Sequence, residues 1–277
     1  MQYDPIKRSL GKVFNQTVFL RRLFYAMLDL LLLRTWHVKK AFREWKKTAP
    51  SDIQILDAGM GFGQYSWFMA RQLPKAQILG VDVKTEQVAD CNEFFTRANQ
   101  NNARFEEADL TKFIQKEKYD FVLSVDVMEH IEEDVQVFKN FHASMKEGGM
   151  LLISTPSDQG GSDVHHHHHD EEYVNDGTHS FIDEHVRDGY GIEEIKEKLK
   201  TAGFSSSEAH YAYGAPGKIS WKISMKYPIL MLNATKLFFI LLPFYYLITF
   251  PFAIILNYLD VRGKHKTGTG LIVKAWK

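Results

Sequence analysis

The pattern of hydrophobic and polar positions changes character twice along this chain. Between residues 53 and 204, short apolar runs alternate with amphipathic segments; the runs are IQILDAG, AQILGVDV, ARFEEADL, YDFVLSVD and GMLLISTP. Such alternation is typical of a parallel sheet with helices on both faces. We therefore predict an α/β fold with a doubly wound sheet here. The intervals predict helices at 65–73, 85–98, 110–115 and 132–145.

The first fifty residues have a helical pattern instead. Apolar side chains recur between Leu20 and Trp45 at the spacing of one helix face, and most basic residues lie opposite, although Arg34 interrupts the apolar stripe. A signal peptide is not expected, because Asp29 lies within the apolar stretch and no small-residue cleavage site follows. Two interpretations stay open: a helix packed on its own domain, and a basic amphipathic helix at a lipid interface.

A run of twenty uncharged residues, 237–256, lies late in the chain. As a helix it would reach about 30 Å, enough to cross a bilayer, but Pro243 and Pro251 favour two short pieces over one rod. Residues suited to lipid headgroups lie around it, and these are Lys218, Lys222, Lys226, Lys236, Tyr245, Tyr246, Tyr258, Arg262, Lys264 and Lys266. We predict that 219–262 enters one leaflet as a re-entrant or in-plane helical hairpin. The alternative is a helical subdomain buried against the N-terminal helix or a partner chain.

Composition and charge narrow the class of protein. The chain has 277 residues, of which 45% are hydrophobic, and a single cysteine, so we expect a folded domain without an internal disulfide framework. Its formal charge of zero hides an asymmetry: 11 basic and 3 acidic residues in 1–50, 14 and 29 in 51–204, and 9 and 2 in 205–277. Basic, apolar flanks around an acidic body favour an anionic membrane surface over nucleic acid as partner. We expect the protein on the cytoplasmic side of a membrane.

The candidate chemistry begins where the first predicted strand ends, in ILDAGMGFGQYS. Gly59, Gly61 and Gly63 allow a tight turn and let a ligand approach bare backbone. The spacing D-x-G-x-G-x-G differs from the dinucleotide fingerprint G-x-G-x-x-G. Asp57 would repel a pyrophosphate and would favour a ligand that carries an ammonium and a sulfonium. Asp82, nineteen residues past Gly63, ends the second strand, where a carboxylate can accept hydrogen bonds from a ribose diol.

Further motifs follow in a recognisable order. Asp109 in EEADL, after the third strand, is a candidate acceptor from an adenine amino group. Together with LDAGMGFG, GVDV, SVDVMEHI and KEGGMLLISTP, this pattern resembles the class I S-adenosylmethionine-dependent methyltransferases over about residues 53–204. The resemblance implies S-adenosyl-L-methionine as the cofactor. It would be bound by Asp57, Gly59, Gly61, Gly63, Asp82, Val83, Asp109, Leu110, Val125, Asp126 and Met128.

The resemblance also implies a seven-stranded, mostly parallel, Rossmann-like sheet whose last strand, GLIVKAW, inserts antiparallel. Since that strand must rejoin the sheet, a single membrane crossing by 237–256 would leave it on the wrong side. Both ends of the hydrophobic segment should therefore lie on one side of the membrane. The predicted organisation is a basic amphipathic helical segment at 1–50, a methyltransferase core at 51–218, a membrane-associating helical insertion at 219–262 and the final core strand at 263–277.

The implied reaction is an in-line methyl transfer, which needs alignment, exclusion of water and, for a neutral hydroxyl, removal of a proton. His130 and His185 are the candidate bases, and a structural role is the alternative for each. No metal is expected; the five histidines at 165–169 favour a solvated loop over a metal site. We predict a membrane-associated methyltransferase that acts, at oxygen, on a lipophilic small molecule or lipid. The alternative is a non-catalytic, cofactor-binding scaffold protein at the membrane.

Overall fold

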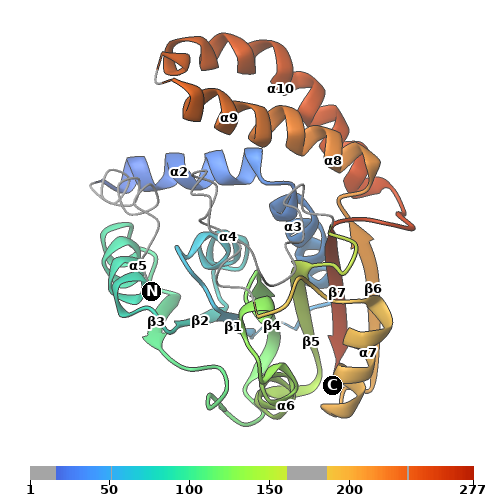
Figure 1. The fold of residues 1–277 in the computed structure, drawn as a ribbon. Helices are drawn as coiled ribbons and strands as arrows, with labels where there is room; N and C mark the ends of the chain where they lie inside the picture. The colour runs from blue at the N-terminus through green and yellow to red at the C-terminus, as the bar shows by residue number, and fades with distance from the viewer. Residues whose placement is uncertain (1–16, 51, 161–185, 236) are drawn as a thin grey trace, which may run out of the picture.

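A seven-stranded sheet forms the centre of the protein, for which a computed structural model describes residues 17–50, 52–160, 186–235 and 237–277 (Figure 1). Within these residues the strand order is β3-β2-β1-β4-β5-β7-β6. β1 to β5 run parallel, and β7 is antiparallel to both β5 and β6. The predicted doubly wound, mostly parallel sheet with an antiparallel last strand is thus confirmed. The strands are β1 Gln54–Ala58, β2 Gln77–Asp82, β3 Ala103–Glu107, β4 Tyr119–Val125, β5 Met145–Pro156, β6 Ser206–Ala212 and β7 Gly270–Trp276.

Helices cover both faces of the sheet, and each face has its own hydrophobic cluster. One cluster joins Ile55 of β1 to Phe42 and Phe95 from the helices on that face. The other joins Leu56, the next residue of β1, to Phe138 on the opposite face. Successive strand residues thus enter opposite layers, as expected of strands buried on both sides. The helices are α3 Leu33–Lys46, α4 Gln64–Gln72 and α5 Thr85–Arg97 on the first face, and α6 Asp134–Ser144 and α7 Ile192–Thr201 on the second.

The predicted helix at 110–115 is wrong. After one turn, closed by the amides of Lys112 and Phe113 on the carbonyl of Asp109, the backbone takes distant partners. The Gln115 amide donates to Ser144 Oγ at 3.0 Å, outside any local helix. Because the chain must reach the start of β4 within a few residues, these long-range bonds replace the helical ladder. The remaining predicted helices of the core are confirmed to within two residues at each end.

The N-terminal segment forms two helices, α2 Val18–Leu31 and α3, which meet at Leu32 in an extended conformation. In α3 the predicted apolar stripe is the buried face. In α2 the stripe is only partly buried: Phe24 packs against the core, Leu23 and Met27 are more than 40% exposed, and Arg21 and Tyr25 are buried. The reason is that both polar side chains bind the carbonyl of Phe62, Arg21 through Nη2 at 2.9 Å and Tyr25 through its hydroxyl. Both helices therefore pack on their own domain.

A helical hairpin connects β6 to β7 and lies beyond α2 in Figure 1. Its first arm is α8 Ala215–Trp221, a π-helical turn η2 Lys222–Lys226, and α9 Tyr227–Ala234. Its second arm is α10 Phe238–Arg262, a single helix that continues through Pro243 and Pro251, so the expected break into two pieces is wrong. Each proline removes one ladder bond, and its ring crowds the carbonyl four residues earlier. Tyr245 and Tyr246 also donate through their hydroxyls to carbonyls of the first arm, at 2.6 and 2.9 Å, and thereby hold the middle of α10 in place.

The two ends of the hairpin are fastened together at Asp260, a fully buried carboxylate. It accepts hydrogen bonds from the amides of Gly217 at 3.0 Å and Tyr213 at 3.1 Å. It also pairs with Nε2 of His37 at 2.9 Å and of His265 at 3.2 Å, so α3, α8 and the chain after α10 converge on it. β7 then re-enters the sheet opposite the last residue of β5. The hairpin therefore leaves and returns at the carboxyl edge of the parallel strands.

Candidate active site

The glycine loop between β1 and α4 lies at the carboxyl edge of the sheet. The amides of Gly59 and Met60 donate to the carbonyl of Val81 at 2.8 and 3.0 Å, which holds the loop against the end of β2. Gly59, Gly61 and Gly63 all have positive φ, of 75°, 52° and 72°. Glycine reaches this region without the steric penalty that a Cβ brings, so the sequence D-x-G-x-G-x-G is required by the backbone itself.

The three glycines face different surroundings. A Cβ at Gly59 would lie 2.2 Å from Val127, and one at Gly63 would lie 2.9 Å from Sγ of Cys91. At Gly61 no described atom lies within 4 Å of the Cβ position. Gly59 and Gly63 therefore serve close packing within the protein. Gly61 instead presents bare backbone toward open space, which is where a ligand can approach it.

Asp82 lies beside this loop, as the sequence predicted. Its Oδ2 accepts from the Gly61 amide at 3.0 Å, and its Oδ1 accepts from the Lys84 amide, also at 3.0 Å. The next residue, Val83, is 57% exposed although it is apolar. A carboxylate that can accept from a diol thus lies between the bare loop and an exposed apolar side chain, an arrangement that suits a nucleoside.

Asp57 is too deeply buried to contact a ligand directly. It is only 2% exposed, and Ser66 of α4 donates to its Oδ2 at 2.6 Å. Burial raises the pKa of Asp57 to about 6. The side chain therefore fastens α4 to β1 and acts on a ligand only through its charge.

Asp109 and Leu110 follow β3, the neighbour of β2. Asp109 accepts from the amide and the hydroxyl of Thr111 at 2.9 and 2.7 Å, and these bonds, with Lys112 nearby, lower its pKa. The Ala108 amide donates to the carbonyl of Asp82 at 3.1 Å, which keeps the two carboxylates at one edge. Leu110 is 5% exposed and belongs to the core.

The end of β4 packs against the glycine loop through Val127, the neighbour of Gly59. Asp126 has a positive φ of 52°, and its amide donates to the carbonyl of Ser154 at 2.8 Å. Its carboxylate forms an ion pair with Arg34 of α3. Val125 is partly buried, whereas Met128 is fully buried and lies in the core. Of the expected cofactor residues on this segment, Val125 and Asp126 are thus the accessible ones.

The candidate bases have different outcomes. His130 ends the short helix η1 Met128–His130 and is exposed at its surface. His185 and the histidines at 165–169 lie outside the described residues. A titratable group that the sequence analysis missed is Glu129, which is 1% exposed, accepts from the Thr155 hydroxyl at 3.0 Å and has its pKa raised by burial. The sequence signal that could have identified Glu129 is its position in the MEHI motif, directly before His130.

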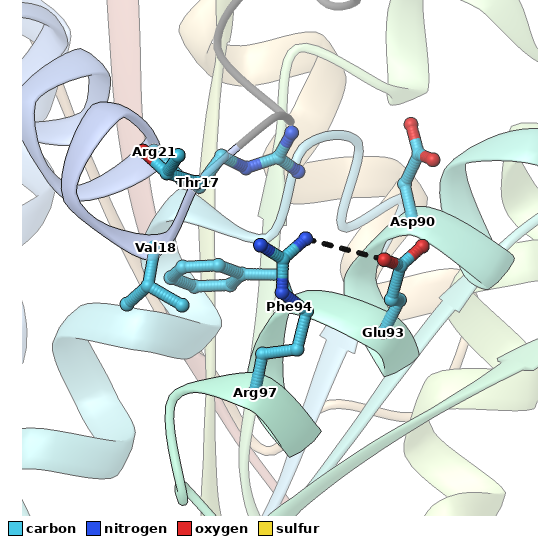
Figure 2. A pocket seen from close by; sticks show the side chains of 7 residues that line it. All are labelled: Thr17, Val18, Arg21, Asp90, Glu93, Phe94 and Arg97. Atoms are coloured by element: carbon cyan, nitrogen blue, oxygen red, sulfur yellow. Dashed lines mark hydrogen bonds and ion pairs between the residues drawn. The ribbon is translucent and has the colours of Figure 1, made fainter.

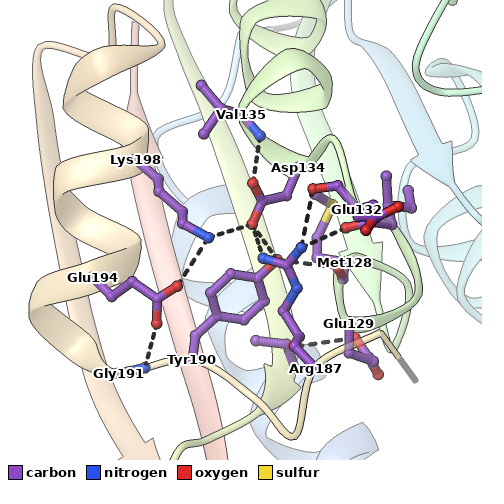
Figure 3. Close-up of polar contacts among 12 residues, drawn as sticks. Met128, Glu129, Glu132, Asp134, Val135, Arg187, Tyr190, Gly191, Glu194 and Lys198 are labelled. Atoms are coloured by element: carbon purple, nitrogen blue, oxygen red, sulfur yellow. Dashed lines mark hydrogen bonds and ion pairs between the residues drawn. The ribbon is translucent and has the colours of Figure 1, made fainter.

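A polar cluster around Asp134 holds this segment in position (Figure 3). Lys198 donates to Asp134 at 2.7 Å, Tyr190 does so at 2.9 Å, and Arg187 forms an ion pair with it. Burial opposes ionisation here, but these three partners keep the pKa of Asp134 low. The Tyr190 hydroxyl also lies 3.0 Å from the carbonyl of Met128. The cluster thereby fixes η1 relative to α6 and α7.

Two hollows lie near the N-terminal helices. One, of about 10 Å³ between α2 and α5, is lined by Phe94 and Arg97 among others (Figure 2). It has room for about one water molecule. The other has a volume of about 140 Å³ and lies between the α2–α3 junction and both arms of the hairpin. Arg34 lines this larger cavity and also pairs with Asp126, so the cavity adjoins the end of β4.

Comparison with known proteins identifies the relatives of this fold. Residues 50–208, more than half of the chain, match the family described as methyltransferase domain. The (S)-coclaurine N-methyltransferase of Papaver somniferum is 26% identical over 148 residues, which are 53% of this chain and 39% of that protein. The malonyl-[acyl-carrier protein] O-methyltransferase of Bacillus anthracis is 30% identical over 108 residues, 39% of each chain. The chain thus spans about 39% of the length of these curated relatives.

Solved structures agree on the fold. The phosphoethanolamine N-methyltransferase 2 of Haemonchus contortus, solved with phosphomonomethylethanolamine and S-adenosylhomocysteine, has a TM-score of 0.57 at 18% identity. The match covers 86% of this chain and 52% of that one. An S-adenosylmethionine-dependent methyltransferase from Mesorhizobium loti has a TM-score of 0.51 at 16% identity. That match covers 85% of this chain and 96% of the Mesorhizobium loti protein. At these identities the likeness establishes the architecture alone.

Proposed function

This chain belongs to the methyltransferase domain family, and from that membership we propose that it transfers a methyl group from S-adenosyl-L-methionine to an apolar small molecule at a membrane surface. The solved neighbours include methyltransferases bound to S-adenosylmethionine and to S-adenosylhomocysteine, which supports this cofactor. The curated relatives act at nitrogen and at oxygen, according to their names. Transfer to oxygen is our proposal for this chain.

The residues present fit that cofactor. The observation that carries the proposal is the Asp82 carboxylate, 3.0 Å from the amide of Gly61, at a point where a Cβ would meet no described atom. Asp82 would accept from the ribose hydroxyls, and the bare backbone around Gly61 would face the methionine part. Val83 would cover the adenine, with Asp109 near its amino group.

When bound, the cofactor would supply an activated methyl group on a cationic sulfur, which would leave as a neutral thioether, and a hydroxyl acceptor would have to give up its proton. The chain's task is to align the acceptor and exclude water. His130 is the proposed recipient of the proton among the described residues, and His185 stays the second candidate. The ionised Asp57 favours a cationic ligand through its charge.

The hairpin supports a location at the membrane. Within the described part of the chain, α10 is the helix long and apolar enough to cross a bilayer. Its most apolar stretch has a mean hydropathy of 2.2, and only 6% of that stretch is buried. Leu237, Ile240 and Leu247 are 70%, 68% and 76% exposed. Moving one such side chain out of water contributes about 1.5–3 kcal/mol. Since both arms start and end at one edge of the sheet, we propose a hairpin within one leaflet on the cytoplasmic side.

Charge on the hairpin supports an anionic lipid surface as the partner. Lys218 and Lys222 lie on the first arm, and Arg262 and Lys264 lie at the end of the second. Each cation near such a surface contributes about 1 kcal/mol. The basic arms and the apolar α10 together match the interface between headgroups and acyl chains.

Vesicle flotation tests the membrane proposal. In the test variant Ile240, Phe244 and Leu247 are replaced by Asp; the control replaces Glu193, Glu197 and Lys200 of the core helix α7 by Ala. We expect the wild type and the control to float with vesicles that contain anionic lipid, and the test variant to stay at the bottom. S-adenosylmethionine affinity, measured by calorimetry, should be equal in all three. Full flotation of the test variant would contradict the role of the hairpin.

A further inference from the structure

The cavity of about 140 Å³ at the root of the hairpin has the size of a ring. A cavity of roughly 150 Å³ lined by apolar side chains takes up benzene in another protein. Here Leu31 and Leu33 from the α2–α3 junction form one apolar wall, and Trp221 and Met225 from the first arm form another; the rest of the lining is more polar and includes Ser220, Ser224 and Asn257. Trp221 is 45% exposed, so it lies where the cavity meets the surface of the hairpin.

One buried polar atom beside this cavity lacks a partner within the part of the chain that the structure describes. Asn257 of α10 is 3% exposed and lines the cavity, and its Oδ1 has no hydrogen-bond partner among the described residues. A buried acceptor left unsatisfied costs roughly 1–3 kcal/mol. In an otherwise apolar helix, such an atom indicates a ligand that brings a hydrogen-bond donor.

Arg34 limits the charge of that ligand and connects the cavity to the cofactor site. Its side chain lines the cavity and forms an ion pair with Asp126, next to the segment that packs on Gly59. The pair brings no net charge to the cavity wall, so a neutral donor such as a hydroxyl matches this site better than an ammonium, which would enter it without a free counter-charge.

We infer that this cavity binds the hydroxyl-bearing ring of a phenol-like amphiphile, with the hydroxyl on Asn257 and the apolar remainder passing Trp221 toward the exposed hairpin. The inference rests on the proposed function, because it supplies that function with an acceptor class. It assigns to the hairpin a second task besides anchoring, which is to deliver a lipophilic phenol from the bilayer to the Arg34–Asp126 pair.

The test uses two probes that differ by one hydroxyl, 4-fluorophenol and fluorobenzene, titrated by ¹⁹F NMR into the full chain in nanodiscs. Asn257→Ala is compared with Asn233→Ala, the same change at an exposed position of α9, so that partition into the lipid cancels. We expect the wild type and Asn233→Ala to bind 4-fluorophenol roughly two- to tenfold more tightly than fluorobenzene, the effect of one hydrogen bond. In Asn257→Ala that preference disappears while fluorobenzene still binds.

A third variant, Met225→Trp, fills the cavity and should abolish binding of both probes. Equal affinities for the two probes in the wild type, or a phenol preference that survives in Asn257→Ala, would overturn the inference. Calorimetry with S-adenosylmethionine on the same samples separates the two proposals. Intact cofactor binding without a phenol preference defeats this inference alone, whereas a wild type that does not bind the cofactor defeats the proposed function.

Discussion

The different surroundings of Gly59 and Gly61 predict that alanine mainly lowers stability at Gly59 and mainly weakens cofactor binding at Gly61. Both have positive φ, and a Cβ in that region costs about 1–2 kcal/mol. At Gly59 the Cβ would also lie 2.2 Å from Val127, which adds about 1–3 kcal/mol of overpacking. Gly59→Ala should therefore lower the free energy of unfolding by about 2–5 kcal/mol, and Gly61→Ala by only about 1–2 kcal/mol.

Affinity for the cofactor should follow the reverse order. A methyl group at Gly61 projects into the space where no described atom lies within 4 Å, so it would occupy ligand volume. We expect Gly61→Ala to weaken S-adenosylmethionine binding at least tenfold, a loss of about 1.4 kcal/mol. Under conditions in which the Gly59→Ala variant is folded, it should retain most of its affinity for S-adenosylmethionine. Thermal unfolding and calorimetry on the same preparations measure the two quantities.

A double-mutant cycle isolates the steric part of the Gly59 effect. Val127→Ala removes the side chain that the new Cβ would touch, so Gly59→Ala should be less destabilising in that background by about 1–3 kcal/mol. The reasoning would be refuted if Gly61→Ala bound the cofactor as well as the wild type does, or if Val127→Ala gave the Gly59 variant no relief.

Three further predictions concern the carboxylates of Asp82, Asp57 and Asp260. Asp82→Asn should weaken S-adenosylmethionine binding about tenfold or more in calorimetry, because hydrogen bonds to a charged acceptor are worth about 1.5–3 kcal/mol; unchanged affinity would contradict the ribose role. Burial raises the pKa of Asp57 from its ordinary value of 3.8 to about 6, so as the pH falls through 6 the folded state takes up a proton that the unfolded state does not yet bind. Relative to Asp57→Asn, the wild type should therefore gain about 2.4 kcal/mol of stability between pH 7 and pH 4 in denaturant titrations, and parallel curves would refute this. Asp260→Leu leaves the amides of Tyr213 and Gly217 and the ring of His37 without their acceptor. Hydrogen exchange at the root of the hairpin should therefore accelerate strongly while the sheet stays protected. Unchanged exchange at the root of the hairpin would contradict the anchoring role of Asp260.

The sequence predicted those parts of the site that local backbone chemistry determines. The spacing of Gly59, Gly61 and Gly63 reflects positive φ angles, which only glycine tolerates cheaply, so the loop was readable without tertiary information. The position of Asp82 beside the glycine loop was predictable because adjacent parallel strands end at the same edge of the sheet. The antiparallel last strand followed from the resemblance, and it correctly placed both ends of the hairpin together.

Features that depend on distant partners were not predictable from local pattern. Arg21 reads as a surface residue on a helical wheel, yet it is buried because a carbonyl forty-one positions away, on Phe62, accepts from it. Arg34 was visible only as an interruption of an apolar stripe, and its partner Asp126 lies on another element. The continuity of α10 through two prolines likewise depends on hydroxyls that reach the first arm.

The most direct test of the central claim follows the methyl group itself. Purified wild type and the Asp82→Asn variant are incubated with membranes and S-adenosylmethionine labelled in the methyl group, and the label is counted after extraction into organic and aqueous phases. The account predicts label in the organic phase with the wild type and a strong reduction with Asp82→Asn. Cofactor binding in calorimetry with no label above background in the organic phase would contradict it and would favour a cofactor-binding scaffold instead.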